Sequence, residues 1–322
     1  MTLSNATQRN ATQRSSVWNK IRHCIPRSFL LILMPFYRTY KKILCCYVGL
    51  WDKRRIKQIG VGVDCIPPAS LRYKIQGSPD LDGFLKVGKQ CSQDIEAALK
   101  KNGKEFGSFR NILDFGCGCG RTFIYYKDYT KSARFYGTDI DADLISWCRS
   151  NLDFVECDVN MPLPPSKYAS EMFDFIYAIS VFTHLNEDYQ FQWLAELKRI
   201  TKPNAIVLLT ILGEHCWRTL RTTDIIKIER DGFSFIIHNT MKGIFPNWYQ
   251  TAYHTKKYIF ENYPKYFKII DYIPRGMTNF QDIVLLEKTS GDSIPNYCPP
   301  EAGLTVQPTA GLTAIIPLFS GM

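Results

Sequence analysis

The residues best suited to chemistry lie in one short stretch, NILDFGCGCGRT, in which an apolar run leads through Asp114 into Gly116, Gly118 and Gly120. A glycine turn between a strand and a helix presents backbone N–H groups and a helix N-terminus to a ligand. The dinucleotide-binding pattern G-x-G-x-x-G does not fit, because the third glycine comes one residue early and Arg121 stands where that pattern needs glycine. The spacing therefore disfavours an NAD-linked dehydrogenase.

The same stretch resembles the first motif of the class I S-adenosylmethionine (SAM)-dependent methyltransferases, D/E-x-G-x-G-x-G. The resemblance extends over roughly residues 70–288. It implies SAM as the cofactor, with Asp114 at the methionine ammonium and the glycine backbone close to the ligand. It also implies that Cys117 lies in the cofactor-binding turn and that Arg121 meets the carboxylate end of the methionine.

Further cofactor residues are expected at the carboxyl ends of the following strands, where ligands of open α/β sheets bind. Asp139 ends the segment FYGTD, and the resemblance places it at the ribose, whose two hydroxyls a carboxylate can accept with its two oxygens. Asp141, two residues later, is instead expected to cap the next helix. By resemblance, Asp158 accepts from the adenine amine. Three more residues complete the expected cofactor site: Ile140, Val159 and Ser180.

Two histidines are candidates for the general base that a hydroxyl acceptor requires. His184 lies in VFTHL after the fourth strand, where the alternative roles are a backbone hydrogen bond or a helix cap. His254 lies in an aromatic insertion that resembles a substrate lid, and its neighbours Trp248 and Tyr249 are expected to contact the substrate. Arg275 is expected to hold an anionic substrate group, with a surface ion pair as the alternative.

The residues after the fourth strand distinguish branches of this family. Enzymes that methylate exocyclic base amines carry N/D-P-P-Y/F there, whereas this chain has Ala-Ile-Ser-Val. The run VFTHL and the later E-L-x-R-x-x-x-P resemble a bacterial small-molecule or glycan branch. The usual Pro-Gly-Gly turn is replaced by Pro203-Asn204-Ala205, and Asn204 is expected to keep the turn because asparagine tolerates the left-handed conformation.

The elements that must position these residues alternate between strand and helix patterns, which predicts a parallel sheet. Strands are expected near 111–116, 133–139, 153–158, 173–179, 205–212, 266–273 and 281–288, and helices near 81–106, 120–130, 142–151 and 187–200. The resemblance implies a Rossmann-like α/β fold with a seven-stranded, mostly parallel sheet, its last strand antiparallel and helices on both faces. Residues 66–288 would form this domain, with a turn-rich linker at 66–78 and a lid-like insertion at about 213–264.

Charge is concentrated in the N-terminal arm, residues 1–65, which is expected to be partly disordered and partly an amphipathic helix. The first 60 residues carry twelve Lys or Arg and one acidic residue, whereas the whole chain has a net charge of +10. The apolar run Phe29–Met34 is too short to span a bilayer. Residues 17–57 are therefore expected either to lie on a membrane surface or to pack on the domain, with a transit peptide or a nucleic-acid-binding arm as weaker alternatives.

The eleven cysteines, odd in number and irregularly spaced, indicate a cytoplasmic protein without disulfides, with peripheral contact at the inner face of the membrane as an extension of the arm hypothesis. No metal site is expected, because no second Cys or His pair lies at zinc-like spacing from Cys117 and Cys119. Residues 289–322 are expected to be a disordered tail.

The favoured function is methyl transfer from SAM to a small molecule, with the oxygen of a sugar or a lipid-linked glycan as the expected acceptor. Two other functions stay open. One is an RNA or protein methyltransferase that uses the basic arm, although the residues after the fourth strand make nucleic acid the less favoured partner. The other is a membrane-associated SAM-binding protein without turnover.

Overall fold

The computed structural model describes residues 27–59, 65–237 and 250–290. These residues belong to two compact units, one containing the described residues up to Phe84 and the other those from Leu85 onward. This clustering differs from the division expected at residue 65. The 289–322 tail lies outside the described residues from residue 291 onward.

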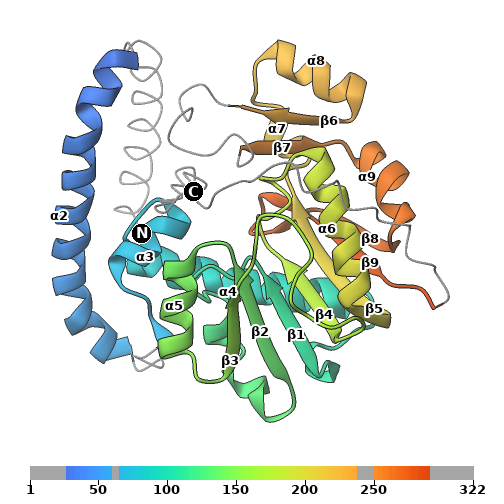
Figure 1. Cartoon of the computed structure of the whole chain (residues 1–322), viewed down its shortest axis with the longest axis horizontal. Helices are drawn as coiled ribbons and strands as arrows, with labels where there is room; N and C mark the ends of the chain where they lie inside the picture. The colour runs from blue at the N-terminus through green and yellow to red at the C-terminus, as the bar shows by residue number, and fades with distance from the viewer. Residues whose placement is uncertain (1–26, 60–64, 238–249, 291–322) are drawn as a thin grey trace, which may run out of the picture. The chain divides into compact units, whose positions relative to one another are not determined.

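The first unit consists of α2 (Arg27–Ile59), α3 (Ala69–Gln76) and the start of α4 (Leu81–Lys101) (Figure 1). The expected helical arm is confirmed in α2. The expected turn-rich linker is wrong at residues 69–76, because Pro68 precedes the first turn of α3 and Gly77, with φ of 69°, ends it in the left-handed conformation that glycine adopts readily. In the described ranges, no helix is both long enough and apolar enough to cross a bilayer.

The second unit is built on a seven-stranded sheet with the order β3-β2-β1-β4-β5-β9-β8. The strands are β1 (Asn111–Phe115), β2 (Arg134–Asp139), β3 (Val155–Val159), β4 (Phe173–Ala178), β5 (Thr201–Ile211), β8 (Lys268–Met277) and β9 (Gln281–Glu287). Neighbours from β3 to β5 pair in parallel, and β9 is antiparallel to both β5 and β8. The predicted sheet, including its antiparallel last strand, is confirmed.

Helices cover both faces of this sheet, because successive strand residues point to opposite sides. On one face, Leu113 and Phe115 join a core with Trp193 of α6 (Glu187–Ile200) and residues of α9 (Lys256–Asn262). On the other face, α4 is attached through Tyr125, whose hydroxyl donates to the Leu85 carbonyl at 2.7 Å. Helix α5 (Ala142–Asn151) connects β2 to β3. Asp114 lies between Leu113 and Phe115 and therefore faces the second layer.

The expected helix at 120–130 is replaced by two 3₁₀ turns, η3 (Phe123–Tyr125) and η4 (Lys127–Lys131). A 3₁₀ turn places residues i and i+3 on the same side. Tyr126 and Tyr129 are spaced in this way, and their ring centroids lie 4.2 and 4.9 Å from that of Phe106. Packing both rings on Phe106, itself in the turn η2 (Phe106–Ser108), favours the tighter geometry over an α-helix.

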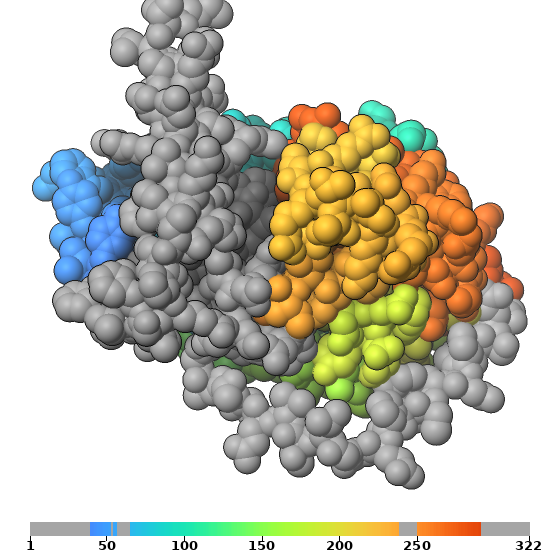
Figure 2. Space-filling view, turned by 90° about the horizontal axis from the view of Figure 1, so that it is seen from above, coloured from blue at the N-terminus to red at the C-terminus, as the bar shows by residue number. Residues whose placement is uncertain are grey.

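The region expected to be a lid forms a small subdomain of α7 (Glu214–Trp217), α8 (Thr222–Asp231) and a two-stranded sheet of β6 (Phe233–Ile236) and β7 (Thr251–His254). Its core contains Leu212, Trp217, Ile228 and Tyr253. In Figure 2 the gold surface of α7, α8 and β6 adjoins the orange surface of β7 and α9. The turn η6 (Tyr263–Lys265) then leads into β8.

Candidate functional site

The glycine turn curls over the carboxyl end of β2. The N–H groups of Gly116 and Cys117 donate to the Thr138 carbonyl at 2.7 and 3.0 Å, and the Gly118 N–H donates to Asp139 Oδ2 at 2.9 Å. Gly116 has φ of 87°, and a Cβ added there would lie 2.3 Å from Val181 Cγ2. Glycine is therefore required at position 116 by conformation and by space, and the turn is held between β2 and the loop after β4.

Asp114 is a buried carboxylate beside this turn, with 4% of its surface exposed. Its Oδ2 accepts from Thr122 Oγ1 at 2.9 Å, and that hydroxyl lies 3.1 Å from Tyr177 Oη. Burial raises the pKa of Asp114 to about 7, although the hydrogen bonds from Thr122 and Tyr177 oppose the shift. Within the described part of the chain its contacts are hydroxyls rather than cations, so an ammonium group would complete its surroundings.

Asp139 ends β2 on the other side of the turn. Its Oδ1 accepts from the Asp141 N–H and its Oδ2 from the Gly118 N–H, both at 2.9 Å. Burial raises the pKa of Asp139 to about 6. Asp141 caps α5 by accepting from the N–H groups of Asp143 and Leu144, which confirms the role expected for it. The two carboxylates are close enough for the charge of Asp139 to raise the pKa of Asp114.

Arg121 directly follows the last glycine of the turn and is half-buried. Its Nη1 is buried and, among the described residues, has no hydrogen-bond partner. The side chain passes over Gly88 of α4, where an added Cβ would lie 2.8 Å from Arg121 Cγ. A buried hydrogen-bond donor without a partner is costly.

The end of β3 offers apolar surface beside a neutralised acid. Asp158 forms ion pairs with Arg149 and Lys167. Although burial opposes the shift, the Lys167 hydrogen bond and the two positive charges lower the pKa of Asp158. Val159 and Met161 are 42% and 60% exposed. Asp158, which was expected to accept from the adenine amine, is thus already paired with Arg149 and Lys167. The exposed side chains of Val159 and Met161 are suited to contact an aromatic ring.

The loop after β4 begins at Ser180, which has φ of 60°, an uncommon backbone conformation for a residue other than glycine. Its N–H donates to Thr210 Oγ1 at 2.7 Å, and its Oγ accepts from Gln281 Nε2 at 2.6 Å. Gln281 is 2% exposed, and its Oε1 has no hydrogen-bond partner among the described residues. The sequence pattern does not show this contact, because it joins residues that are 101 positions apart in the chain.

His184 lies four residues after Ser180 and is nearly buried. Its Nδ1 lies 2.8 Å from the Gln250 carbonyl oxygen, which only accepts, so Nδ1 carries the proton and Nε2 is the unprotonated nitrogen, which is buried. Burial lowers the pKa of His184 to about 4, although the Gln250 hydrogen bond opposes the shift. The ring is therefore neutral at physiological pH.

His254 is completely buried and belongs to a hydrogen-bonded core network. Its Nε2 lies 2.9 Å from Gln190 Oε1, which also accepts from Tyr263 Oη at 3.0 Å. The Gln190 amide in turn donates to the carbonyls of Phe182 and Leu185, both at 3.0 Å. This network braces the loop that carries His184. We therefore replace the expected catalytic role of His254 by a structural one, since its ring has no surface for a substrate to contact.

Of the three residues expected to bind substrate, the structure describes only Arg275. Trp248 and Tyr249 lie outside the described residues. Arg275 is exposed, its N–H donates to Asp282 Oδ1 at 2.7 Å, and its Nε donates to the Asn279 carbonyl at 3.2 Å. In the described ranges its guanidinium is thus held by a backbone oxygen rather than by an acid.

Comparisons with known proteins show which proteins this chain is similar to. Residues 112–204 match a family model described as a methyltransferase domain. A solved SAM-dependent methyltransferase of Methanosarcina mazei is 18% identical, with a TM-score of 0.41, over 56% of this chain and 92% of its own. The 1,6-didemethyltoxoflavin-N1-methyltransferase of Burkholderia thailandensis, with 1,6-didemethyltoxoflavin and S-adenosylhomocysteine bound, is 14% identical, with a TM-score of 0.45, over 66% of this chain and 82% of its own.

The family-model match is more informative, because the matched segment includes the glycine turn together with Asp114 and Asp139. Three charged groups lie at or near this turn: Asp114 is buried, Arg121 has a buried Nη1, and Asp139 ends the next strand. Residues 112–204 of this chain therefore match a methyltransferase domain.

Proposed function

We propose that this domain transfers the methyl group of SAM to an oxygen atom of a small molecule, and specifically of a sugar or a lipid-linked glycan. The observation that carries the enzymatic part of the proposal is the pair of carboxylates on either side of the glycine turn, of which Asp114 is buried and Asp139 is half-buried. Each has a raised pKa and neither is neutralised by a cation within the described residues.

The chain's own residues would hold the cofactor by complementary charge. Asp114 would accept from the methionine ammonium, and the buried Nη1 of Arg121 would donate to the methionine carboxylate. Asp139 would accept from the two ribose hydroxyls, since each of its oxygens has a second lone pair beyond the N–H groups it now holds. When bound, SAM supplies a methyl group activated by a sulfonium.

The remaining cofactor contacts would be largely apolar. The exposed side chain of Val159, with Met161 beyond it, offers one flank for adenine, and Ile140 at the end of β2 offers the other. Asp158 would act mainly by holding Arg149 and Lys167 at the edge of this site. Ser180 lies at the end of β4 beside the turn, where the methyl group would be transferred.

An oxygen acceptor is favoured by the state of His184. A hydroxyl must lose a proton as it attacks the methyl carbon, and a neutral imidazole with Nε2 as acceptor is able to take that proton. The carbonyl of Gln250 fixes this tautomer, and the network around Gln190 fixes the loop. The lowered pKa makes His184 a weak base, so the loop's main contribution would be to align the hydroxyl with the methyl group.

A membrane-bound or lipid-linked acceptor is suggested by one face of α2. Five large apolar side chains on it are 55% to 67% exposed: Tyr40, Ile43, Tyr47, Leu50 and Trp51. Each residue advances about 100° around a helix, so these five fall within an arc about 100° wide. The opposite side of α2 carries Asp52, which is buried against α3. An exposed apolar stripe of this kind is typical of a helix that lies in a membrane interface.

This apolar stripe is accompanied by exposed basic residues, Lys42 and Arg54. Arg54 projects within the arc of the apolar stripe, at its C-terminal end. We therefore expect full-length protein to sediment with vesicles of anionic phospholipid and much less with neutral ones. The double change Leu50→Ser and Trp51→Ser should lower the partition coefficient about tenfold or more, since each buried side chain contributes roughly 1.5–3 kcal/mol.

The matched control is Ile226→Ser, because Ile226 is an equally exposed apolar residue, 58%, in α8 of the other unit. It should bind vesicles like the unchanged protein. Protein that stays in the supernatant with every vesicle composition would instead show that the apolar stripe is covered by protein.

The acceptor is best sought by mass spectrometry of glycolipids and small metabolites from strains that carry the gene, lack it, or carry His184→Gln. We expect one species to lose a CH₂ increment in the deletion strain and largely in the His184→Gln strain, while purified His184→Gln still binds S-adenosylhomocysteine normally. If RNA or protein from these strains loses a methyl group and no glycolipid or metabolite does, the proposed glycan acceptor is wrong. Unchanged spectra together with retained cofactor binding would favour a binding protein without turnover.

A further inference from the structure

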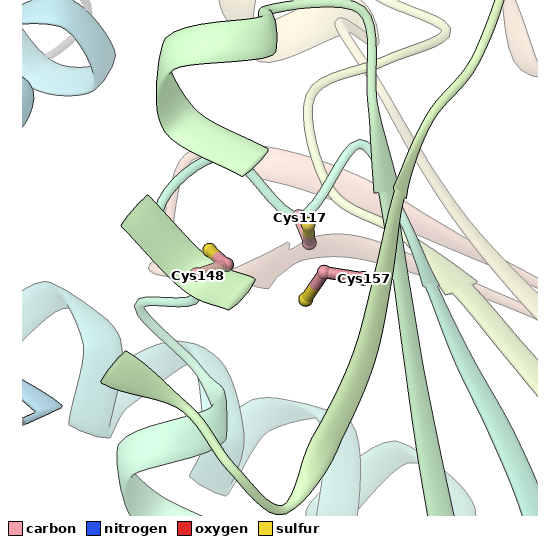
Figure 3. Close-up of side chains that lie close together, drawn as sticks. All are labelled: Cys117, Cys148 and Cys157. Atoms are coloured by element: carbon pink, nitrogen blue, oxygen red, sulfur yellow. The ribbon is translucent and has the colours of Figure 1, made fainter. Parts of the chain in front are cut away.

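Three cysteines that are far apart in sequence meet under the glycine turn. Cys117 lies in the turn after β1, Cys148 on α5 and Cys157 on β3, and all three are buried (Figure 3). Their Sγ atoms lie within 4.8 Å of one another. The spacings along the chain, 31 and 9 residues, match no zinc motif, which is why the sequence predicts no metal here. Cys119, the nearer partner in sequence, is not part of this group.

A backbone oxygen lies close to two of the three sulfurs. The carbonyl oxygen of Gly118 lies 3.7 Å from Cys117 Sγ and 3.5 Å from Cys148 Sγ. In a tetrahedral zinc site, with Zn–S of about 2.3 Å and Zn–O of about 2.1 Å, a sulfur and an oxygen ligand lie about 3.6 Å apart. Two sulfur ligands of the same site lie about 3.8 Å apart, which the upper limit of 4.8 Å accommodates.

We propose that Cys117, Cys148 and Cys157, with the Gly118 carbonyl, bind one Zn²⁺ ion in a tetrahedral site that braces the glycine turn. Three thiolates exclude the hard ions Mg²⁺ and Ca²⁺, which prefer oxygen ligands. The bound ion and three thiolates would carry a net charge of about −1. Arg149 lies beside them, with its Nε donating to the Cys157 carbonyl at 2.9 Å, and it offsets that charge.

The backbone of Cys117 and Gly118 would connect the zinc ion to the end of β2. Gly118 contributes its carbonyl to the zinc site, and its N–H donates to Asp139 Oδ2. Cys117 donates its N–H to the Thr138 carbonyl at 3.0 Å. Space for the sulfurs depends on Gly137, where an added Cβ would lie 2.9 Å from Cys117 Sγ and 3.2 Å from Cys157 Sγ. The ion would therefore fix the position of the glycine turn relative to Asp139, because Gly118 contacts both. In other metal sites, too, residues that hydrogen-bond to the metal ligands are held in place together with them.

The test uses full-length protein purified under reducing conditions, with its zinc content measured by mass spectrometry after extensive dialysis. We expect about one zinc ion per chain, and in protein stripped of metal and titrated with Co²⁺ the intense visible bands of a tetrahedral thiolate site. Cys148→Ser and Cys157→Ser should each reduce the bound metal at least about tenfold. Cys91→Ser is the matched control, because Cys91 is equally buried, 1%, on α4 and outside the group.

Measurements on the unchanged protein keep the test independent of whether the variants fold. Stripping the ion should weaken S-adenosylhomocysteine binding about tenfold, and stoichiometric Zn²⁺ should restore it. Protein that holds no zinc and gives no cobalt bands overturns the metal site, and so does a pair of the three thiols recovered as a disulfide from reduced samples. Stoichiometric zinc with unchanged ligand affinity overturns the bracing role. Metal content does not depend on methyl transfer, so these results are separable from the proposed function.

Discussion

Asp139→Asn is expected to lower the affinity for S-adenosylhomocysteine, the demethylated product, by about 100-fold or more. Two hydrogen bonds from ribose hydroxyls to a charged acceptor contribute roughly 1.5–3 kcal/mol each, and 100-fold corresponds to about 2.7 kcal/mol. At present one carboxylate oxygen accepts from the Gly118 N–H and the other from the Asp141 N–H. In asparagine one of these oxygens is replaced by an NH₂ group, which donates and would therefore lose one of the two hydrogen bonds. Isothermal titration calorimetry of the full-length protein measures the change.

The matched control is Asp141→Asn, two residues later. Asp141 acts as the cap of α5, and asparagine is as good a cap as aspartate, so this variant should bind the ligand like the unchanged protein. A loss of less than about tenfold in Asp139→Asn, or an equal loss in both variants, would show that the end of β2 does not hold the ribose.

The same titrations should depend on pH in a defined direction. Burial raises the pKa of Asp114 to about 7 and that of Asp139 to about 6, from an ordinary 3.8. At pH 5 both groups are largely protonated, so Asp114 would lose its attraction for the ligand's ammonium group and Asp139 part of its capacity to accept from the ribose hydroxyls. The affinity should therefore be low at pH 5 and should rise up to about tenfold per pH unit for each proton released, levelling off above pH 7.

The free protein should show the opposite trend. A carboxyl whose pKa is raised by folding holds its proton more tightly in the folded state, so its contribution favours folding at low pH and is lost as pH rises toward the folded pKa. Between pH 4 and pH 7, these two groups should therefore lower the stability of the ligand-free domain. If the affinity for S-adenosylhomocysteine does not change between pH 4 and pH 7, Asp114 and Asp139 do not contact the ligand.

Arg72→Met is expected to destabilise the first unit by about 3–5 kcal/mol, because it leaves a buried carboxylate without its counter-charge. Arg72 is completely buried and forms an ion pair with Asp52 of α2. Its guanidinium also donates to the Pro79 carbonyl at 2.7 Å and to the Pro67 carbonyl at 2.7 Å. One side chain therefore ties α2, α3 and the segments on both sides of α3 together.

Hydrogen exchange resolved by peptides from residues 65–84 measures this change, since it reports the free energy of local opening. Arg55→Met is the control: Arg55 also pairs with an acid, Asp82, but the pair is exposed and should contribute little. The double change Asp52→Leu with Arg72→Met should recover most of the loss, because no charge then stays buried. Exchange unaffected by Arg72→Met would show that α2 is held in another way.

Local patterns in the chain were sufficient to predict the sheet and the cofactor turn. Alternating strand and helix segments imply parallel strands, and the apolar run before Asp114 can only be a buried strand. The left-handed residue at Asn204, with φ of 62°, was also predictable, because few other residues adopt that conformation without strain. These features depend on neighbours in sequence, so sequence reasoning was enough for them.

Other features depend on residues that are distant in sequence. The 3₁₀ turns follow from two tyrosines packing on Phe106, and α3 is held by an arginine that reaches Asp52. The sequence pattern indicates that His254 is a base in an aromatic lid, whereas in the structure its ring is hydrogen-bonded to Gln190, which also accepts from Tyr263. No pattern of spacing reveals such partners, because they come from other elements of the fold.

The sequence by itself therefore determined the succession of strands along the chain, the glycine turn and the acids at the strand ends, since these follow from hydrophobic periodicity and local backbone preference. The antiparallel last strand was expected from the family resemblance. Only the tertiary structure decided which groups are buried and what they contact. It assigned His184 a fixed tautomer, showed the Arg121 cation without a partner among the described residues, and gathered three cysteines beneath one turn. Burial and proximity set pKa values and ligand geometry, and both arise only when distant segments pack together.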